Sequence, residues 1–252
     1  MTAAKLTAAP RSHPNPRFGL WLPADVETPG WLYRVLQPVA QLGFTALWKA
    51  RVFGRHHEPT GGGVAYVANH QSFLDPVLVS FGLRRPLNFM ARDSLFRSGP
   101  FRWLIESLNA FPVKRNAADT GALKEAMRRL RKNAQVLVFP EGTRTRDGRI
   151  GPFRPGVALL SQRAATWTVP VLIDGAFEAW PREKRLPRPG RIVVQYGEPV
   201  AQAEARKLGG QALANRLRDR IVQMQTDVRR RLGRPTVECQ SAAETLRKGV
   251  RT

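Results

Sequence analysis

The sequence of 252 residues contains little cysteine and few acidic residues. Its one cysteine, Cys239, excludes a disulfide within the chain and a cysteine-based metal site, and such sparse use fits a reducing compartment. Only 19 acidic residues stand against 41 lysines and arginines, which gives a net charge of +22 and a pI near 11.6. A charge of this size implies attraction to a polyanion, namely nucleic acid, an anionic bilayer or a phosphorylated substrate.

The N-terminal part lacks a long hydrophobic run. Residues 1–19 have no apolar core of the kind a secretory signal needs, and we expect a disordered leader. Between Arg34 and Lys49 lie 14 uncharged residues, whereas a bilayer span needs roughly 20 apolar ones. Aromatic and basic residues at both ends, among them Trp31 and Trp48, favour a helix lying at the lipid headgroups over a helix packed on the domain. We assign residues 20–57 to this N-terminal interfacial helical motif.

Motifs typical of nucleic-acid binding are also missing. The sequence has no zinc-finger spacing, no aromatic RNA-recognition motif and no basic zipper, and its basic residues are scattered over many segments. No second histidine or acidic cluster accompanies His70, so a metal site there is not expected, and His56-His57 is typical of an exposed loop. We therefore expect no nucleic-acid partner and no metal.

The stretch Val64 to Asp75 contains the first candidate site. An apolar, β-branched run over residues 64–68 follows three glycines and predicts a buried strand that ends at Asn69 and His70. Asp75 directly precedes a proline, which suits the cap and first position of a helix. On one continuous helix, residues five apart would point about 140° away from each other. A strand-to-helix turn can instead bring the carboxylate of Asp75 onto the imidazole of His70.

The rest of the chain alternates between strand and helix patterns. Strands are predicted over residues 87–91, 110–113, 135–139, 169–173 and 192–196, with helices over 76–81, 94–108, 122–132, 155–165 and from 208 onward. This order predicts an α/β fold, with a mostly parallel or mixed central sheet covered by helices, over residues 58–233. Arginines on the helices, including Arg129 and Arg229, are interpreted as solvated, with anion binding as an alternative for the helix over 122–132 and lipid contact as an alternative for the last helix. Residues 234–252 are expected to form a flexible tail.

Polar side chains follow three of the predicted strands. His70, Arg115 and the segment Glu141 to Arg144 each lie just past a strand. Ligands of open α/β sheets bind beyond the carboxyl ends of the strands, so these residues are expected to converge on one crevice. A carboxylate beside a histidine fixes its tautomer, which lets the other ring nitrogen take a proton from a hydroxyl.

Four ordered segments resemble the conserved blocks of the glycerolipid acyltransferases. They are Asn69-His70-Gln71-Ser72-Phe73-Leu74-Asp75, Phe111-Pro112-Val113-Lys114-Arg115, Phe139-Pro140-Glu141-Gly142-Thr143-Arg144 and Val169-Pro170-Val171. The branch that these segments resemble most is that of the 1-acyl-glycerol-3-phosphate acyltransferases. Two positions depart from the pattern, because Asn109 stands near a frequent glycine and Thr145 stands where serine is common.

The resemblance implies a reaction and a set of roles. An acyl chain would pass from a thioester on coenzyme A or acyl carrier protein to the hydroxyl of a lysophospholipid, giving phosphatidic acid at the cytoplasmic face of the membrane. His70 would be the general base, oriented by Asp75. Arg115 and Arg144 would hold the acceptor phosphate, Gly142 would allow close approach of the backbone, and Glu141 with Thr143 would complete the acceptor site.

Other interpretations stay open at this point. No serine lies in a Gly-x-Ser-x-Gly elbow, so direct transfer is expected and not an acyl-enzyme. Glu141 could instead form a structural ion pair with a nearby arginine. The acceptor could be another lyso-lipid, and the protein could be a non-catalytic basic protein that binds membranes.

Overall fold

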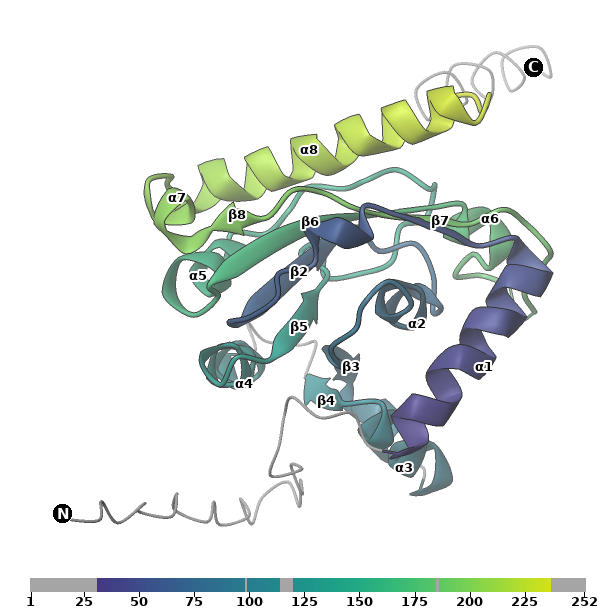
Figure 1. The fold of residues 1–252 in the computed structure, drawn as a ribbon, viewed down its shortest axis with the longest axis horizontal. Coiled ribbons are helices and arrows are strands. Elements are labelled where there is room, and N and C mark those ends of the chain that lie inside the picture. Colours follow the sequence, from purple (N-terminus) through teal and green to yellow (C-terminus); the bar gives the residue numbers. More distant parts are fainter. Residues whose placement is uncertain (1–30, 98, 114–119, 185, 237–252) are drawn as a thin grey trace, which may run out of the picture.

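The computed structural model describes residues 31–97, 99–113, 120–184 and 186–236, and in these ranges it shows an α/β fold (Figure 1). The strands are β1 Arg51–Phe53, β2 Val64–Ala68, β3 Leu87–Arg92, β4 Ala110–Val113, β5 Gln135–Val138, β6 Trp167–Asp174, β7 Val193–Tyr196 and β8 Val200–Ala201. The α-helices are α1 Trp31–Trp48, α2 Asp75–Ser80, α3 Gly99–Ser107, α4 Thr120–Arg131, α5 Gly156–Arg163, α6 Ala176–Ala179, α7 Gln202–Arg206 and α8 Gly210–Arg231. Short 3-10 helices cover Arg55–His57 and Asp93–Arg97.

These strands form one mixed sheet in the order β1-β7-β6-β2-β5-β3-β4, with β8 paired to β6. Neighbours from β6 through β2, β5 and β3 to β4 run parallel, whereas β7 and β8 run antiparallel to β6. The predicted α/β class and mixed sheet are confirmed. Strand β1, which pairs with β7, lies inside the segment assigned to the N-terminal motif, so the sheet begins earlier in the chain than predicted.

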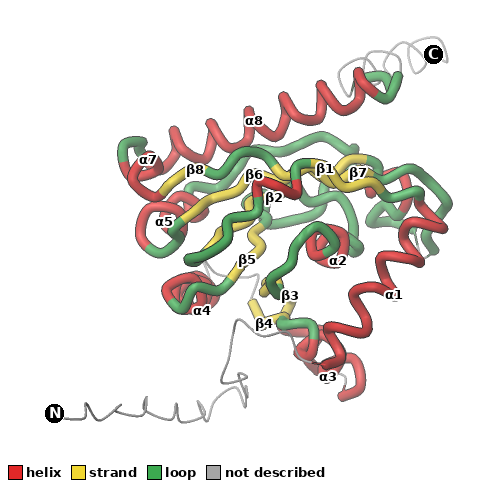
Figure 2. The backbone as a smooth tube through the Cα atoms, viewed as in Figure 1, coloured by secondary structure: helices red, strands yellow, loops and turns green. Residues whose placement is uncertain are grey.

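Side chains of the central strands alternate between two cores. In β5, Val136 and Val138 point to one face, where they join the apolar sides of α4, α5 and α8, and Leu137 points to the other. Tyr66 of β2 and Val169 of β6 join Leu137 in the second core, near α2 and α6. Figures 1 and 2 show this layering, with α4, α5, α7 and α8 on one side of the strands and α1 and α2 on the other. Burial on both faces explains the unbroken apolar run of β5, because each buried Val or Leu contributes roughly 1.5–3 kcal/mol.

Two arginines interpreted as solvated are buried, and that interpretation is wrong for both. The Arg129 side chain, on α4, is 4% exposed; it donates to Glu125 and Asn88 and lies over the Phe111 ring. Arg229, on α8, has a side chain only 3% exposed and pairs with a carboxylate on β6. Arg129 is compensated by Glu125 of the same helix, and Arg229 by Asp174, 55 residues earlier in the chain.

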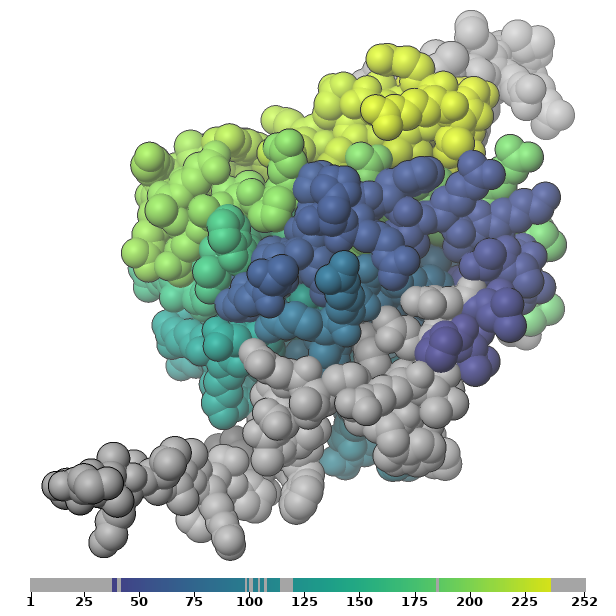
Figure 3. Space-filling model, viewed as in Figure 1, coloured from purple at the N-terminus to yellow at the C-terminus, as the bar shows by residue number. Residues whose placement is uncertain are grey.

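Both ends of the described chain bear on the predictions. Trp48 was interpreted as an interfacial residue, but it is buried and its indole N–H donates to the carbonyl of Arg188 at 2.7 Å, so this interpretation is wrong. At the other end, Arg234 donates to the carbonyl of Arg191, which ties down the first residue of the expected tail. The leader, residues 20–30 of the N-terminal motif and residues 237–252 of the tail lie outside the described residues. In the space-filling view (Figure 3), α7 and α8 border one side of the visible face and α1 the other.

Candidate active site

The turn between β2 and α2 is fixed by side chains that point into the protein. The amide of Asn69 donates to the carbonyl of Ile173 and accepts its N–H, at 2.9 and 2.8 Å, and so continues the pairing of β2 with β6 by one position. Gln71 accepts two backbone N–H groups at the start of α6, each at 3.2 Å. The hydroxyl of Ser72 donates to the carbonyl of Trp180 at 3.0 Å. These contacts leave the turn little freedom to move against the sheet.

His70 and Asp75 meet within this turn, as predicted. The distance between His70 Nδ1 and Asp75 Oδ2 is 2.7 Å, and Asp75 is completely buried while the His70 side chain is 14% exposed. The same Oδ2 atom accepts the backbone N–H groups of Gln71 at 2.6 Å and Ser72 at 2.8 Å. Asp75 does not cap α2, contrary to the prediction, because Leu74 holds that position and the carboxylate binds backwards into the turn.

The tautomer of His70 follows from these contacts. Because Oδ2 already accepts two N–H groups, the imidazole proton in this pair belongs on Nδ1, which leaves the lone pair on Nε2. In the described ranges, no protein group forms a hydrogen bond with Nε2. The imidazole ring of His70 stacks on the ring of Phe139, with ring centroids 4.0 Å apart. The backbone carbonyl of His70 accepts the N–H of Thr145. The side chain is therefore held in place on one side and accessible at one nitrogen.

Glu141 links two loops at the site through backbone hydrogen bonds. Its carboxylate accepts the N–H of His70 at 2.9 Å and that of Gly151 at 3.1 Å. Within the described residues, no arginine lies within ion-pair distance of Glu141, so the alternative of a structural ion pair is not what the structure shows. The pKa of Glu141 is raised to about 7, and burial is the main cause. The nearby charge of Asp75 also raises this pKa, whereas the two N–H groups lower it. The sequence pattern could not reveal that Glu141 contacts His70 itself.

The residues after Glu141 form a tight turn with a distinct set of neighbours. Gly142 has φ +73°, a backbone conformation that favours glycine, and a Cβ there would lie 2.9 Å from the guanidinium carbon of Arg154. Arg182 donates to the hydroxyl of Thr143 at 3.4 Å. The guanidinium carbon of Arg144 lies 3.4 Å from the centre of the Phe73 ring. The turns after β2 and β5 thus meet, as the strand pattern predicted.

One predicted member of the site lies outside the described residues. Arg115 belongs to the segment 114–119, so its place in the crevice stays a prediction. Sequence reasoning missed Phe139, which stacks on His70, and Arg182, whose position near Thr143 results from a loop distant in sequence. For Phe139 a signal existed, because it ends an apolar strand directly before the polar cluster.

Comparisons with known proteins agree with this geometry. The family model described as Acyltransferase matches residues 49–174, half of the chain. The chain belongs to the acyltransferase family. That family range contains the turn of His70 and Asp75, the Glu141 segment and strands β2 to β6.

Individual relatives and one solved structure have more specific names. The chloroplastic 1-acyl-sn-glycerol-3-phosphate acyltransferase LPAT1 of Arabidopsis thaliana is 28% identical over 188 residues, covering 73% of this chain and 51% of the relative. The protein of that enzyme name from Bacillus subtilis is 25% identical, covering 61% and 75%. The crystal structure of the 1-acyl-sn-glycerophosphate acyltransferase PlsC from Thermotoga maritima matches with a TM-score of 0.64 and 25% identity, covering 75% and 77%.

Coverage limits what these relatives imply. This acyltransferase spans about half the length of the first curated relatives it matches, with 51%, 42% and 45% covered. The shared part contains the sheet and the turn with His70. This chain therefore shares the fold and the family of these proteins, whereas its acyl acceptor and acyl donor are inferred below.

Proposed function

We propose that this acyltransferase transfers a fatty acyl chain from a thioester to the free hydroxyl of 1-acyl-glycerol-3-phosphate and forms phosphatidic acid. The observation that carries the proposal is the His70–Asp75 pair, in which Asp75 holds Nδ1 and Nε2 has no partner among the described residues. The printed names of the curated relatives and of the matching crystal structure support this acceptor. The donor is the thioester of coenzyme A or of acyl carrier protein, and no cofactor takes part.

His70 acts as the general base. Nε2 takes the proton of the acceptor hydroxyl while the oxygen attacks the thioester carbonyl carbon and forms a tetrahedral intermediate. The carbon–sulfur bond then breaks, and the leaving thiolate takes the proton from the imidazolium, so the products are an ester and a free thiol. Asp75 stabilises the imidazolium between these steps. A positioned base of this kind contributes about 10² to 10⁴ in rate.

Arg144 holds the acceptor phosphate, together with Arg115 in the same role. The Phe73 ring beneath the Arg144 guanidinium keeps it in a fixed plane, and a planar guanidinium can grip a phosphate through two parallel hydrogen bonds. Thr143 is exposed next to Arg182, so both can reach the same anion. Gly142 supports this site through its turn, and Glu141 positions the backbone of His70.

The reaction takes place at a membrane surface, on its cytoplasmic face, because the acceptor and product are lipids and the donors are soluble thioesters. No helix in the described ranges is long and apolar enough to cross a bilayer. On α1, the side chains of Val39, Leu42 and Leu47 are exposed by 62%, 74% and 59%. These apolar groups fit a helix that lies at the lipid headgroups, where the excess positive charge of the chain also favours an anionic surface.

The test is acyl transfer in mixed micelles with purified protein, lysophosphatidic acid and acyl-coenzyme A. His70→Ala should abolish product formation in a protein that still unfolds cooperatively, with some loss of melting temperature because the ring bonds to the buried Asp75 and stacks on Phe139. His56→Ala, in an exposed histidine of the 3-10 helix, is the matched control and should keep wild-type activity. Wild-type turnover in His70→Ala would contradict the role of base.

A panel of substrates tests the rest of the proposal. Acyl carrier protein thioesters replace the first donor, and lysophosphatidylcholine replaces the first acceptor. If the protein prefers lysophosphatidylcholine, which carries a phosphodiester in place of a phosphomonoester, the proposed acceptor is wrong although the acyl transfer chemistry stands. If no donor and acceptor give product, the protein is a non-catalytic member of the family.

A further inference from the structure

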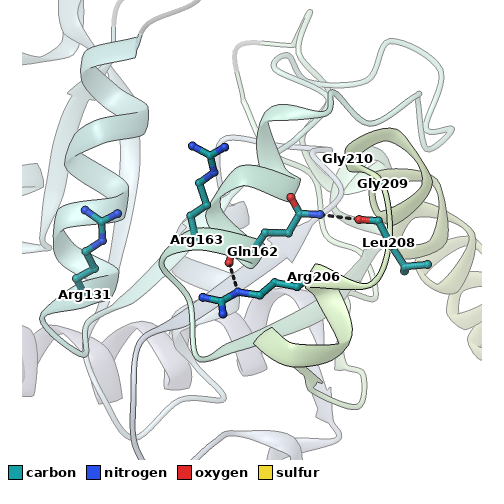
Figure 4. A pocket seen from close by; sticks show the side chains of 7 residues that line it. All are labelled: Arg131, Gln162, Arg163, Arg206, Leu208, Gly209 and Gly210. Atoms are coloured by element: carbon teal, nitrogen blue, oxygen red, sulfur yellow. Dashed lines mark hydrogen bonds between the residues drawn. The ribbon is translucent and has the colours of Figure 1, made fainter.

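A second basic site lies far from His70, in a cavity of about 610 Å³. Its walls are the last residue of α4, the end of α5, the end of α7 and the connection to α8 (Figure 4). The lining residues are Arg131, Gln162, Arg163, Arg206, Leu208, Gly209 and Gly210. Because α4 and α5 lead into the parallel strands β5 and β6, the cavity lies at the amino ends of these strands, whereas His70 follows the carboxyl end of β2.

Three guanidinium groups line this cavity without acidic partners. Among the described residues, no carboxylate lies within 4.0 Å of Arg131, Arg163 or Arg206. By contrast, Arg216 of α8 is neutralised, because it pairs with Glu204 of α7 at 2.7 Å. Figure 4 shows Arg131 on one wall and the other two arginines on the facing wall. The positive charges around this cavity repel each other, so an anion bound between them would offset that electrostatic repulsion.

Part of the wall is already fixed in position. Arg206 Nε donates to the carbonyl of Gln162 at 2.9 Å, and the Gln162 amide donates to the carbonyls of Ala205 and Leu208 at 3.2 and 2.7 Å. These bonds tie the end of α7 to the end of α5. A ligand therefore meets Arg206 with less loss of side-chain freedom than it would on an open surface.

The N-terminus of α8 adds backbone donors to the same cavity. This helix has 22 residues, no acidic residue in its first turn and no side chain capping it. A Cβ at Gly209 would meet nothing within 4 Å and one at Gly210 only an ordinary contact at 3.8 Å, so packing does not require these glycines. Without side chains there, the first N–H groups of the helix stay open to an anion.

The lining selects the chemistry of the ligand. Guanidinium groups and helix N-termini both favour phosphate, and among the described residues no aromatic ring on which a base could stack lines the cavity. Of the described lining residues, only Leu208 has a large apolar side chain, which is too little for an acyl chain. We propose that this cavity binds a phosphate-bearing ligand through Arg131, Arg163, Arg206 and the N-terminus of α8. The site is separate from the proposed active site and does not depend on acyl transfer.

The experiment has two arms, which separate a soluble phosphate from a lipid headgroup. Calorimetric titration with inorganic triphosphate tests the first source, and co-sedimentation with phosphatidic acid vesicles, against phosphatidylcholine vesicles, tests the second. The pocket variant is Arg163→Gln with Arg206→Gln. The control variant is Arg216→Gln with Arg230→Gln, which removes the same charge from exposed positions of α8. Equal melting temperatures would show that both variants are folded.

Binding of either probe should fall about tenfold or more in the pocket variant, because each charge-assisted hydrogen bond contributes roughly tenfold. The control variant should stay within about twofold of wild type, as expected of exposed pairs. Selective loss of triphosphate binding identifies a soluble ligand, and selective loss of vesicle binding identifies a lipid headgroup. Arg131→Gln, on the opposite wall, should reproduce the effect. If the pocket and control variants behave alike in both arms, the cavity is only a solvated basic surface and the proposal is wrong.

Discussion

Two buried carboxylates near the carboxyl edge of the sheet, Asp75 and Asp174, are held in opposite ways. Both are completely buried. Asp75 accepts two backbone N–H groups of its own turn and the ring N–H of His70. Asp174, the last residue of β6, pairs with Arg229 at 2.6 Å and Arg234 at 2.9 Å.

This difference in partners assigns Asp75 to proton transfer and Asp174 to structure. A histidine gains and loses a proton near neutral pH, so a carboxylate beside it can support proton transfer. A guanidinium keeps its charge throughout the accessible pH range, so the partners of Asp174 can only fix structure. Arg229 and Arg234 come from the end of α8 and beyond, and Asp174 thereby attaches that end to β6.

The largest expected effect comes from Asp75→Asn. The amide oxygen would take the place of Oδ2, because two backbone N–H groups point at that atom, so the variant keeps the tautomer of His70 but loses the negative charge that stabilises the imidazolium. We expect kcat to fall by about 10²- to 10⁴-fold, which is the contribution of a positioned base. Steady-state kinetics in mixed micelles measure this. A fall in kcat of less than tenfold would contradict a catalytic role for Asp75 that Asp174 lacks.

Asp174→Asn should act on stability instead. Removing one partner of a buried ion pair costs about 3–5 kcal/mol, because the remaining charge is left without compensation. Denaturant titration measures the free energy of unfolding, and kcat per folded molecule should stay within about twofold of wild type under the same separation of roles. A large loss of kcat in a folded variant would show that this carboxylate also serves the reaction.

Glu141 extends the comparison to a carboxylate held by backbone groups alone. Its pKa is about 7 in the folded protein and 4.5 in its ordinary state, so the folded protein binds a proton that the unfolded chain has released between these values. The stability that this proton contributes is complete below pH 4.5 and is lost as the pH rises through 7. The melting temperature of wild type relative to Glu141→Gln should therefore fall between about pH 5 and pH 8. A constant difference would contradict the raised pKa.

The smallest expected effect concerns Arg144, which lies over the ring of Phe73, whereas Arg229 pairs with a carboxylate. Phe73→Leu removes the ring beneath Arg144, and an exposed contact of this kind contributes about 0.5–1 kcal/mol. We expect the KM for the acceptor to rise about two- to fivefold with kcat unchanged. Leu95→Ala, at another exposed apolar residue, is the control. An equal rise in both variants would point to general membrane contact.

Sequence reasoning located the strands and the turn because their signals are local. The apolar runs that became β2 and β5 are buried on both faces, and the His70 and Asp75 contact spans five residues. Asn109 illustrates the same point, because its φ of +62° explains why glycine is frequent near that position. Such features depend on neighbours within one turn.

The missed features depend on partners distant in the chain. Arg129 lies beside Asn88, 41 residues away, and Arg229 beside Asp174, 55 residues away, so neither helix pattern predicts burial. Strands β1 and β8 have three and two residues, too short for a period-two pattern. Their pairing is set by the longer strands β7 and β6.

The long-range hydrogen bonds that fix the His70 turn also determine when the site can form during synthesis. Asn69 bonds to Ile173, 104 residues later, and Ser72 bonds to Trp180, 108 residues later. Chains emerge from the ribosome starting with the N-terminus, so His70 and Asp75 are present long before the groups that hold their turn. A nascent chain that stops short of β6 has the pair but no means of fixing it, and the enzyme acquires its geometry only when residues 173–180 have emerged.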